Sequence, residues 1–366
     1  MLESPPFWMW ILGFLLVLGP LVTVHELGHY LVGRWFGVKA DAFSIGFGRE
    51  LTGWTDRRGT RWRLALIPLG GYVQFKGDMN PASVPDPRAP TDSDTFQCKP
   101  LWQRALIVFA GPATNLLLAV AIFASFNLAY GKIETHSEIG GFAEISAARD
   151  AGLRQGDLIT RIDGKPISDF SDIGALVMMY PGREVQLTYR RDGAENTVPV
   201  VIDESVESDR FGNESRIGRL GVYSQEPDII PVGPVESVAL AFEQSFGLME
   251  MMVTGVKQIV LGDRSIKELG GPIKIAKYSG EQMSLGPLAM VSFAALISLN
   301  LAFINLLPIP ALDGGHLAFY AAEAVRRKPV GPRGQEWAYR TGMALVLVLM
   351  VVVTVNDIVS LPFFGS

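Results

Sequence analysis

The sequence predicts a polytopic α-helical membrane protein with about four transmembrane helices, a membrane re-entrant β-hairpin and one α/β insert on the outer side. Hydrophobic residues make up 48% of the 366 residues, and they are gathered in blocks instead of being spread along the chain. Four blocks are long enough and sufficiently free of charge to cross a bilayer. The formal net charge of −5 provides no basic surface, so we expect the lipid bilayer, and no nucleic acid, as a partner.

The first span is predicted over residues 7–36, and no charged residue occurs between positions 5 and 24. His25-Glu-Leu-Gly-His29 follows directly on the same helix. Histidines four residues apart lie on one helix face with a rise of roughly 6 Å, so both can bind one metal ion. Glu26 lies on the adjoining flank, where a carboxylate can act as a general base. Ionisable groups at membrane depth cost roughly 2.5–3.5 kcal/mol each on insertion scales, so they indicate function.

This short motif is not specific to proteases. His-Glu-x-x-His occurs by chance in helices, and membrane histidines also serve proton relays and metal transporters.

The first block has no Lys or Arg before it and no small-residue cleavage site, so we expect a retained span instead of a signal peptide. The single cysteine, Cys98, excludes an intrachain disulfide framework and a Cys-rich zinc site.

The segment between the first two spans is more than a plain loop. Its stretch 61–76 has apolar runs interrupted by Pro68 and the Gly70-Gly71 pair, which predicts a hairpin. The hairpin is too short and too polar at its edges to span, but it can dip into the membrane face where protein covers its backbone. Residues 80–95 are rich in Pro and Asp and are predicted to be a flexible connection.

Lys and Arg residues orient the other spans, which are predicted at 105–130, 287–307 and 338–361. They are concentrated between the first and second spans and between the third and fourth. Since such residues favour the cytoplasm, both loops are predicted to lie inside, with both termini and segment 131–286 outside. The two histidines of the first span then lie near the cytoplasmic side.

The third span ends in a second group of informative residues. Pro308 and Pro310 interrupt the helix, so residues 306–312 should be unwound. Asp313 follows directly. A catalytic zinc site needs a third protein ligand besides two histidines, and Asp313 is the candidate. The alternative is a helix-ending turn in which Asp313 only caps the backbone.

The outer segment 136–222 is predicted to be one soluble α/β domain. Its stretch 152–164 resembles the PDZ signature, and 169–179 is then the helix beside the peptide groove. The resemblance places a carboxylate-binding loop at Gly140, Gly141 and Phe142. PDZ grooves add a peptide strand and capture its C-terminal carboxylate. A PDZ fold that binds no peptide and acts as a steric lid is the open alternative.

Residues 235–261 are apolar but carry a charge at every seventh position: Glu236, Glu243, Glu250 and Lys257. This pattern predicts a helix or helix pair on the membrane surface or packed against the spans. A fifth span is the alternative. The predicted organisation is 1–36 first span, 37–100 cytoplasmic-side loop with the β-element, 101–131 second span, 132–222 PDZ-like periplasmic domain, 223–286 amphipathic region, 287–320 third span, 321–337 cytoplasmic loop and 338–361 fourth span.

Three motifs in order resemble the site-2 protease family of intramembrane zinc metalloproteases. They are HELGH in the first span, GPATN at 111–115 and NLLPIPALDG at 305–314. With an outward PDZ-like insert and four spans, the chain resembles the bacterial RseP type over essentially its whole length. The enteric form of that type carries two tandem PDZ domains, whereas this chain has room for one.

The resemblance implies a Zn²⁺ cofactor with His25, His29 and Asp313 as ligands and Glu26 as catalytic base. It implies that an added substrate strand lies along the β-element. The resulting predicted substrate-binding residues are Asn300, Asn305, Pro308, Pro310, Gly46, Gly48, Gly70 and Gly71, with Gly140, Gly141 and Phe142 in the PDZ-like domain. His316 also occurs in the family, and we interpret it as structural.

The resemblance further implies a multi-pass protein of a bacterial inner membrane. Its substrates are single-span membrane proteins, such as anti-sigma factors or signal-peptide remnants, that an upstream site-1 protease has already trimmed. Two rival functions remain at this stage. A metal or proton transporter would use the same ionisable residues, although the sequence lacks inverted repeats. A non-catalytic adaptor would act through the PDZ-like domain, but it would not need Glu26.

Overall fold

The structure of this chain is a computed structural model that describes residues 5–78, 92–208, 214–226, 228–262, 265, 270–328 and 332–359. The chain divides into two compact units. One comprises Met1–Phe123 and Gly270–Asp357, and the other comprises Ala124–Leu269 and Ile358–Ser366. Most of the predicted flexible connection at 80–95 lies outside the described residues.

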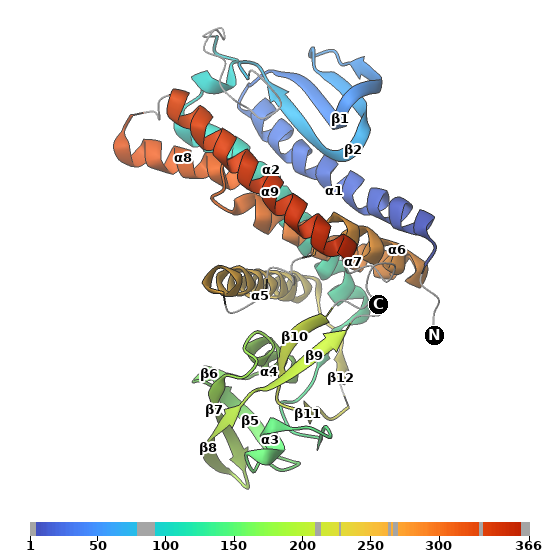
Figure 1. Cartoon of the computed structure of the whole chain (residues 1–366), viewed down its shortest axis with the longest axis vertical. Coiled ribbons are helices and arrows are strands. Elements are labelled where there is room, and N and C mark those ends of the chain that lie inside the picture. Colours follow the sequence, from blue (N-terminus) through green and yellow to red (C-terminus); the bar gives the residue numbers. More distant parts are fainter. Residues whose placement is uncertain are drawn as a thin grey trace. The chain divides into compact units, whose positions relative to one another are not determined.

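Four described helices are long and apolar enough to cross a membrane (Figure 1): α1 (Phe7–Trp35), α2 (Leu101–Tyr130), α7 (Pro287–Leu306) and, within α9 (Pro332–Val359), the part Trp337–Val359. With 29 residues, α1 is roughly 43 Å long, which exceeds the hydrocarbon thickness of a bilayer. The prediction of about four membrane-spanning helices is confirmed to this extent. The segment proposed as an alternative fifth span is the single helix α5 (Pro234–Leu261), and it is not among the four.

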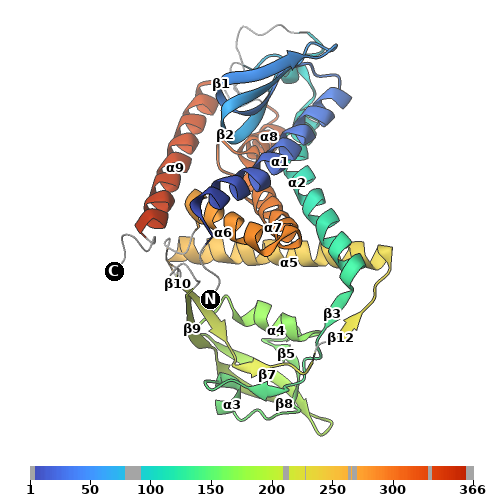
Figure 2. The same cartoon turned by 90° about the vertical axis from the view of Figure 1, so that its right-hand side faces the viewer.

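The first unit also contains a two-stranded sheet of β1 (Ala40–Thr55) and β2 (Arg61–Phe75), drawn in blue in Figure 2. Residues 42–45 each have two partners, one from 61–64 and one from 71–74. The prediction that 61–76 forms a hairpin by itself is therefore wrong. The apolar run with a Pro and two glycines indicates a bend within 61–76. It does not indicate that residues 42–45 lie between 61–64 and 71–74 and pair with both.

The unwound stretch predicted before Asp313 is present. After α7 ends, Leu307 is extended with ψ 139°, because the residue before a proline avoids the helical region. The chain resumes as α8 (Asp313–Arg326). The remaining helices of this unit are α6 (Pro272–Leu285), which packs against α1, and the short 3₁₀ helix η1 (Phe96–Cys98).

Asp357 near the end of α9 fixes the start of α6. Its buried carboxylate accepts hydrogen bonds from the amides of Gly271, Ile273 and Lys274, at 3.0–3.1 Å. The first amides of a helix have no partner inside the helix, so this side chain acts as an N-cap supplied by another helix.

The second unit contains a four-stranded sheet in the order β6-β5-β7-β8, with α4 (Phe170–Val177) beside it. Asp169 starts α4 through a capping box with Asp172. The core includes Ile159, Leu187 and Ile202, none more than 1% exposed. The other elements are β3 (Lys132–Glu134), β4 (Gly141–Phe142), α3 (Ala147–Asp150), β5 (Leu158–Ile162), β6 (Lys165–Pro166), β7 (Glu184–Arg191), β8 (Ala194–Val201), β9 (Asp203–Ser208), β10 (Glu214–Arg219), β11 (Val222–Tyr223) and β12 (Asp228–Ile230).

Candidate metal centre

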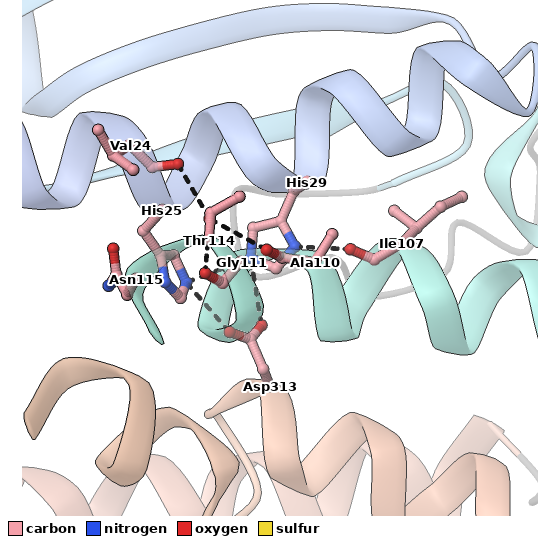
Figure 3. Close-up of polar contacts among 9 residues, drawn as sticks. All are labelled: Val24, His25, His29, Ile107, Ala110, Gly111, Thr114, Asn115 and Asp313. Carbon is pink, nitrogen blue, oxygen red and sulfur yellow. Dashed lines mark hydrogen bonds and ion pairs between the residues drawn. The ribbon is translucent and has the colours of Figure 1, made fainter. Parts of the chain in front are cut away.

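Three predicted ligands converge at one point of the first unit. His25 and His29 project from successive turns of α1, and Asp313 approaches them from the first residue of α8 (Figure 3). Their metal-binding atoms all lie within 4.8 Å of one another. The two imidazole Nε2 atoms are 3.2 Å apart, and the Asp313 carboxylate oxygens lie 3.1 Å from His25 Nε2 and 3.5 Å from His29 Nε2.

The hydrogen bonds around His29 determine which nitrogen faces this point as an acceptor. Its Nδ1 lies 2.9 Å from the carbonyl oxygen of Ile107 on α2. A carbonyl oxygen can only accept, so Nδ1 carries the proton and Nε2 presents its lone pair in the neutral ring. That lone pair is directed at the carboxylate of Asp313 and the Nε2 of His25. Lone pairs that meet in a buried place repel one another unless a proton or a cation lies between them.

The distances fit a single divalent cation. Zinc bonds to imidazole nitrogen and carboxylate oxygen are about 2.0–2.2 Å, so neighbouring ligand atoms of a tetrahedral site lie roughly 3.3 Å apart. The three observed separations of 3.1–3.5 Å bracket this value. Two histidines and one carboxylate are also the number of protein ligands that leaves a fourth position open for catalysis.

Gly111 on α2 leaves the space in which the imidazoles sit. A Cβ atom at this position would lie 2.8 Å from His25 Nε2 and even closer to the ring of His29. Any larger residue would therefore occupy the position where the two ligand nitrogens meet. The GPATN motif therefore supplies a glycine at a point of α2 where a side chain would collide with the two imidazoles.

Glu26 connects the metal centre to the sheet. Its side chain lies against Gly71 of β2, where an added Cβ would be 3.2 Å from Glu26 Cγ. Glu26 and the three candidate ligands line one cavity of about 320 Å³. Other lining residues come from β2, from the end of α7 and the α7–α8 connection, and from α8 and α9, and they include Tyr72, Asn305, His316, Tyr320 and Tyr339.

The α7–α8 connection aims Asp313 into this cavity. Ala311, which also lines the cavity, has φ 92°, a backbone conformation that costs a non-glycine residue of order 1–3 kcal/mol. Gly314 then allows α8 to start against the end of α7, since a Cβ there would collide with the carbonyl oxygens of Leu306 and Leu307. Asp313 therefore faces the two histidines, and Leu312, not Asp313, occupies the N-cap position of α8.

The structure separates the predicted substrate residues into groups. Asn305 and Gly71 line the cavity, whereas Asn300, Pro308, Pro310, Gly46, Gly48 and Gly70 are not among its lining residues. Gly46, Gly48 and Gly70 have φ of 89°, 87° and 110°, and they lie where β1 and β2 bend. Their part in binding stays a prediction.

The three predicted residues of the PDZ-like domain lie at the β4–β11 pair. Gly141 pairs with Tyr223 and Phe142 with Val222. The amide of Gly140 donates to the carbonyl oxygen of Tyr223 at 2.8 Å. This amide is thus already bonded within the domain, and a carboxylate would have to displace that bond.

Sequence reasoning assigned no role to Asn115 or Ile107, although both lie within hydrogen-bonding distance of the candidate ligands. Asn115 is fully buried in an apolar span. A polar side chain at membrane depth was the available signal. The Ile107 carbonyl gave none, since a backbone group is invisible in a sequence.

Comparisons with known proteins agree with this site. The sequence matches Peptidase family M50 over residues 13–349. Proteins named "Putative zinc metalloprotease" from Rhizobium meliloti and Agrobacterium fabrum are 44% and 41% identical, covering 94% and 96% of this chain and 95% and 96% of their own length. "Metalloprotease MmpA" of Caulobacter vibrioides is 33% identical, with 96% of each chain covered.

Among solved structures, the PDZ domain of an SdrC-like protein from Listeria monocytogenes is similar to 25% of this chain and 92% of its own, with 17% identity and a TM-score of 0.19. The family match and the curated relatives decide between the functions that the sequence left open. They exclude the transporter and adaptor alternatives as the principal activity. The chain belongs to peptidase family M50, the site-2 protease family, and it is a zinc-dependent membrane metalloprotease.

Proposed function

We propose that this protein cleaves transmembrane segments of single-span membrane proteins inside a bacterial inner membrane, as the second cut of regulated intramembrane proteolysis. Trimmed anti-sigma factors and signal-peptide remnants are the proposed substrates, and a site-1 protease acts first. The observation that carries the proposal is the convergence of His25, His29, Asp313 and Glu26 in one cavity among membrane-spanning helices. We further propose that the active site lies toward the cytoplasm, with both termini and the PDZ-like domain in the periplasm.

The first requirement is that the substrate helix unwinds, since its peptide bonds are hidden in internal hydrogen bonds. The edge of β2 can offer replacement partners. Residues 71–74 pair with 42–45 of β1, and Gly71, Tyr72 and Val73 line the cavity together with Glu26. The other side of 71–74 pairs with no described strand, so the backbone groups that alternate toward that side can bond to a substrate. An unwound substrate can add there as a strand.

Asn305, which also lines the cavity, can bond further backbone groups of the unwound segment. His25, His29 and Asp313 are the residues that would hold zinc, which supplies Lewis acidity toward the scissile carbonyl and toward water. Glu26 removes the proton from the attacking water and returns a proton to the leaving amine. Its side chain lies against Gly71, beside the strand to which the substrate would add.

The test is cleavage of a tagged single-span substrate, with its outer part already removed, by the purified protein in detergent. Glu26→Gln should lower the rate about 100- to 10,000-fold while the bound zinc is retained, since general-base catalysis contributes that much. A zinc chelator should abolish wild-type cleavage, and added zinc should restore it. Glu243→Gln, which changes an exposed glutamate of α5, is the matched control and should cleave like wild type. Substantial cleavage by Glu26→Gln would refute the assigned role.

A further inference from the structure

Asn115 is a buried polar group that the proposed mechanism does not use. It lies in α2 beside His25 (Figure 3), and its exposed fraction is 0%. Its Nδ2 is 3.3 Å from His25 Nδ1, and its Oδ1 has no hydrogen-bond partner among the described residues. Burying an amide without compensation costs roughly 1–3 kcal/mol, so an asparagine at this place needs a reason.

The protonation state that metal binding requires of His25 supplies that reason. Its Nε2 faces His29 and Asp313, so this nitrogen must present its lone pair to a cation. The neutral imidazole then carries its proton on Nδ1, which becomes a donor. A donor facing the Nδ2 of an amide would leave two N–H groups opposed. A half-turn of the amide group exchanges Oδ1 and Nδ2 and places an acceptor against Nδ1.

We infer that Asn115 is a positioning residue for the metal centre, whose Oδ1 accepts the Nδ1–H of His25. This bond fixes the tautomer and the ring orientation in which His25 Nε2 faces the metal. His29 has the equivalent arrangement, because its Nδ1 donates to the Ile107 carbonyl at 2.9 Å. Helix α2 therefore supplies one acceptor for each ligand imidazole, a backbone oxygen for one and a side-chain oxygen for the other.

The helix packing holds Asn115 in place. The hydroxyl of Ser298 on α7 donates to the backbone carbonyl of Asn115 at 2.8 Å, and both residues are fully buried. This bond joins α2 to α7, the helix that precedes the connection to Asp313. Ser298 bonds to the backbone carbonyl of Asn115. A substitution at Ser298 therefore changes the packing of α2 against α7 but keeps the side-chain group of Asn115 that faces the imidazole of His25.

The inference rests on the proposed ligand roles of His25, His29 and Asp313, and its test reads metal binding instead of turnover. Wild type, Asn115→Ala, Asn115→Asp and Ser298→Ala are purified, and their zinc affinity is measured by competition with a chelator. The visible spectrum of each protein with cobalt(II) replacing zinc reports the ligand geometry. Thermal melting of the metal-free proteins reports folding.

Asn115→Ala should bind zinc roughly 10- to 100-fold more weakly, which is the usual effect of removing such a partner. Asn115→Asp has nearly the same shape and only acceptor oxygens, so it should keep zinc affinity within about threefold and a wild-type-like cobalt spectrum. Ser298→Ala should bind like wild type. Where Asn115→Ala fails to fold, Asn115→Asp decides alone, because an amide that must donate cannot be replaced by a carboxylate.

Wild-type affinity in Asn115→Ala would overturn the inference, and so would a folded Asn115→Asp without metal. An equal loss in Ser298→Ala would show a general loosening of α2 and would contradict it as well. If the proposed ligand roles of His25, His29 and Asp313 were wrong, the wild-type protein itself would not bind zinc tightly. That result differs from every variant outcome named above.

Discussion

At the scale of single residues, Gly111 is a position where the candidate metal centre has no room for a side chain. The missing side chain makes the room in which His25 and His29 meet. We predict that Gly111→Ala displaces one imidazole and lowers bound zinc at least tenfold, because a ligand misplaced by a few tenths of an ångström no longer completes the site. The measurement is zinc content after dialysis against a weak chelator.

The matched control is Gly19→Ala on α1, since a Cβ at Gly19 would meet nothing within 4 Å. This variant should retain the zinc and the helix content of wild type. Undiminished zinc in Gly111→Ala would mean that the histidines rearrange freely, contrary to the close packing of α1 against α2 at this point.

The convergence of the three candidate ligands could be predicted from the sequence, whereas the groups that support them could not. His25 and His29 lie one helical turn apart, so the spacing alone brings them to one face. Asp313 followed because two prolines mark the end of its span. The acceptor at Asn115 depends instead on how α2 lies against α1, and no local pattern encodes that register.

At the scale of elements, the free edge of β2 is the feature that connects the sheet to catalysis. Tyr72 lies on this edge and lines the cavity. In a Cys98→Ser, Glu26→Gln background, we predict that Tyr72→Cys forms a disulfide with a cysteine in the substrate's transmembrane segment, because an added strand passes within bonding distance. Thr52→Cys, which lies on the opposite edge of the sheet, should not crosslink.

The crosslink is read on a non-reducing gel for a series of cysteines along the substrate. A periodicity of two in the reactive positions would identify an added strand, since alternate side chains point to the same face. Equal crosslinking at both edges, or at neither while substrate is bound, would contradict strand addition.

In the same sheet, the local bend could be predicted from the sequence, whereas the pairing of the strands could not. The bend near Gly70 was recognisable, because glycine tolerates the positive φ that it needs. The pairing of 42–45 with both arms of β2 is non-local, and alternation within one strand does not name its partner. Gly140 is a comparable case, since its amide bonds to Tyr223, which is distant in the sequence.

At the scale of the whole molecule, the charge distribution makes a prediction about sidedness. The distribution of Lys and Arg predicts that the 37–100 segment lies inside and the PDZ-like domain outside. The chain has one cysteine, Cys98, which is exposed in the first of these segments and serves as a native probe. Glu184→Cys in a Cys98→Ser background places an exposed probe at the start of β7 in the second.

We predict that a membrane-impermeant maleimide labels the Glu184→Cys protein in intact spheroplasts at once. Cys98 of wild type should react only after the membrane is permeabilised, because the bilayer separates it from the reagent. The unfolded protein in detergent gives full labelling of both as the reference. The reverse pattern would invert the topology and move the metal centre toward the periplasm, and the proposed order of cleavage would then fail, since the outer part of the substrate would no longer face the PDZ-like domain.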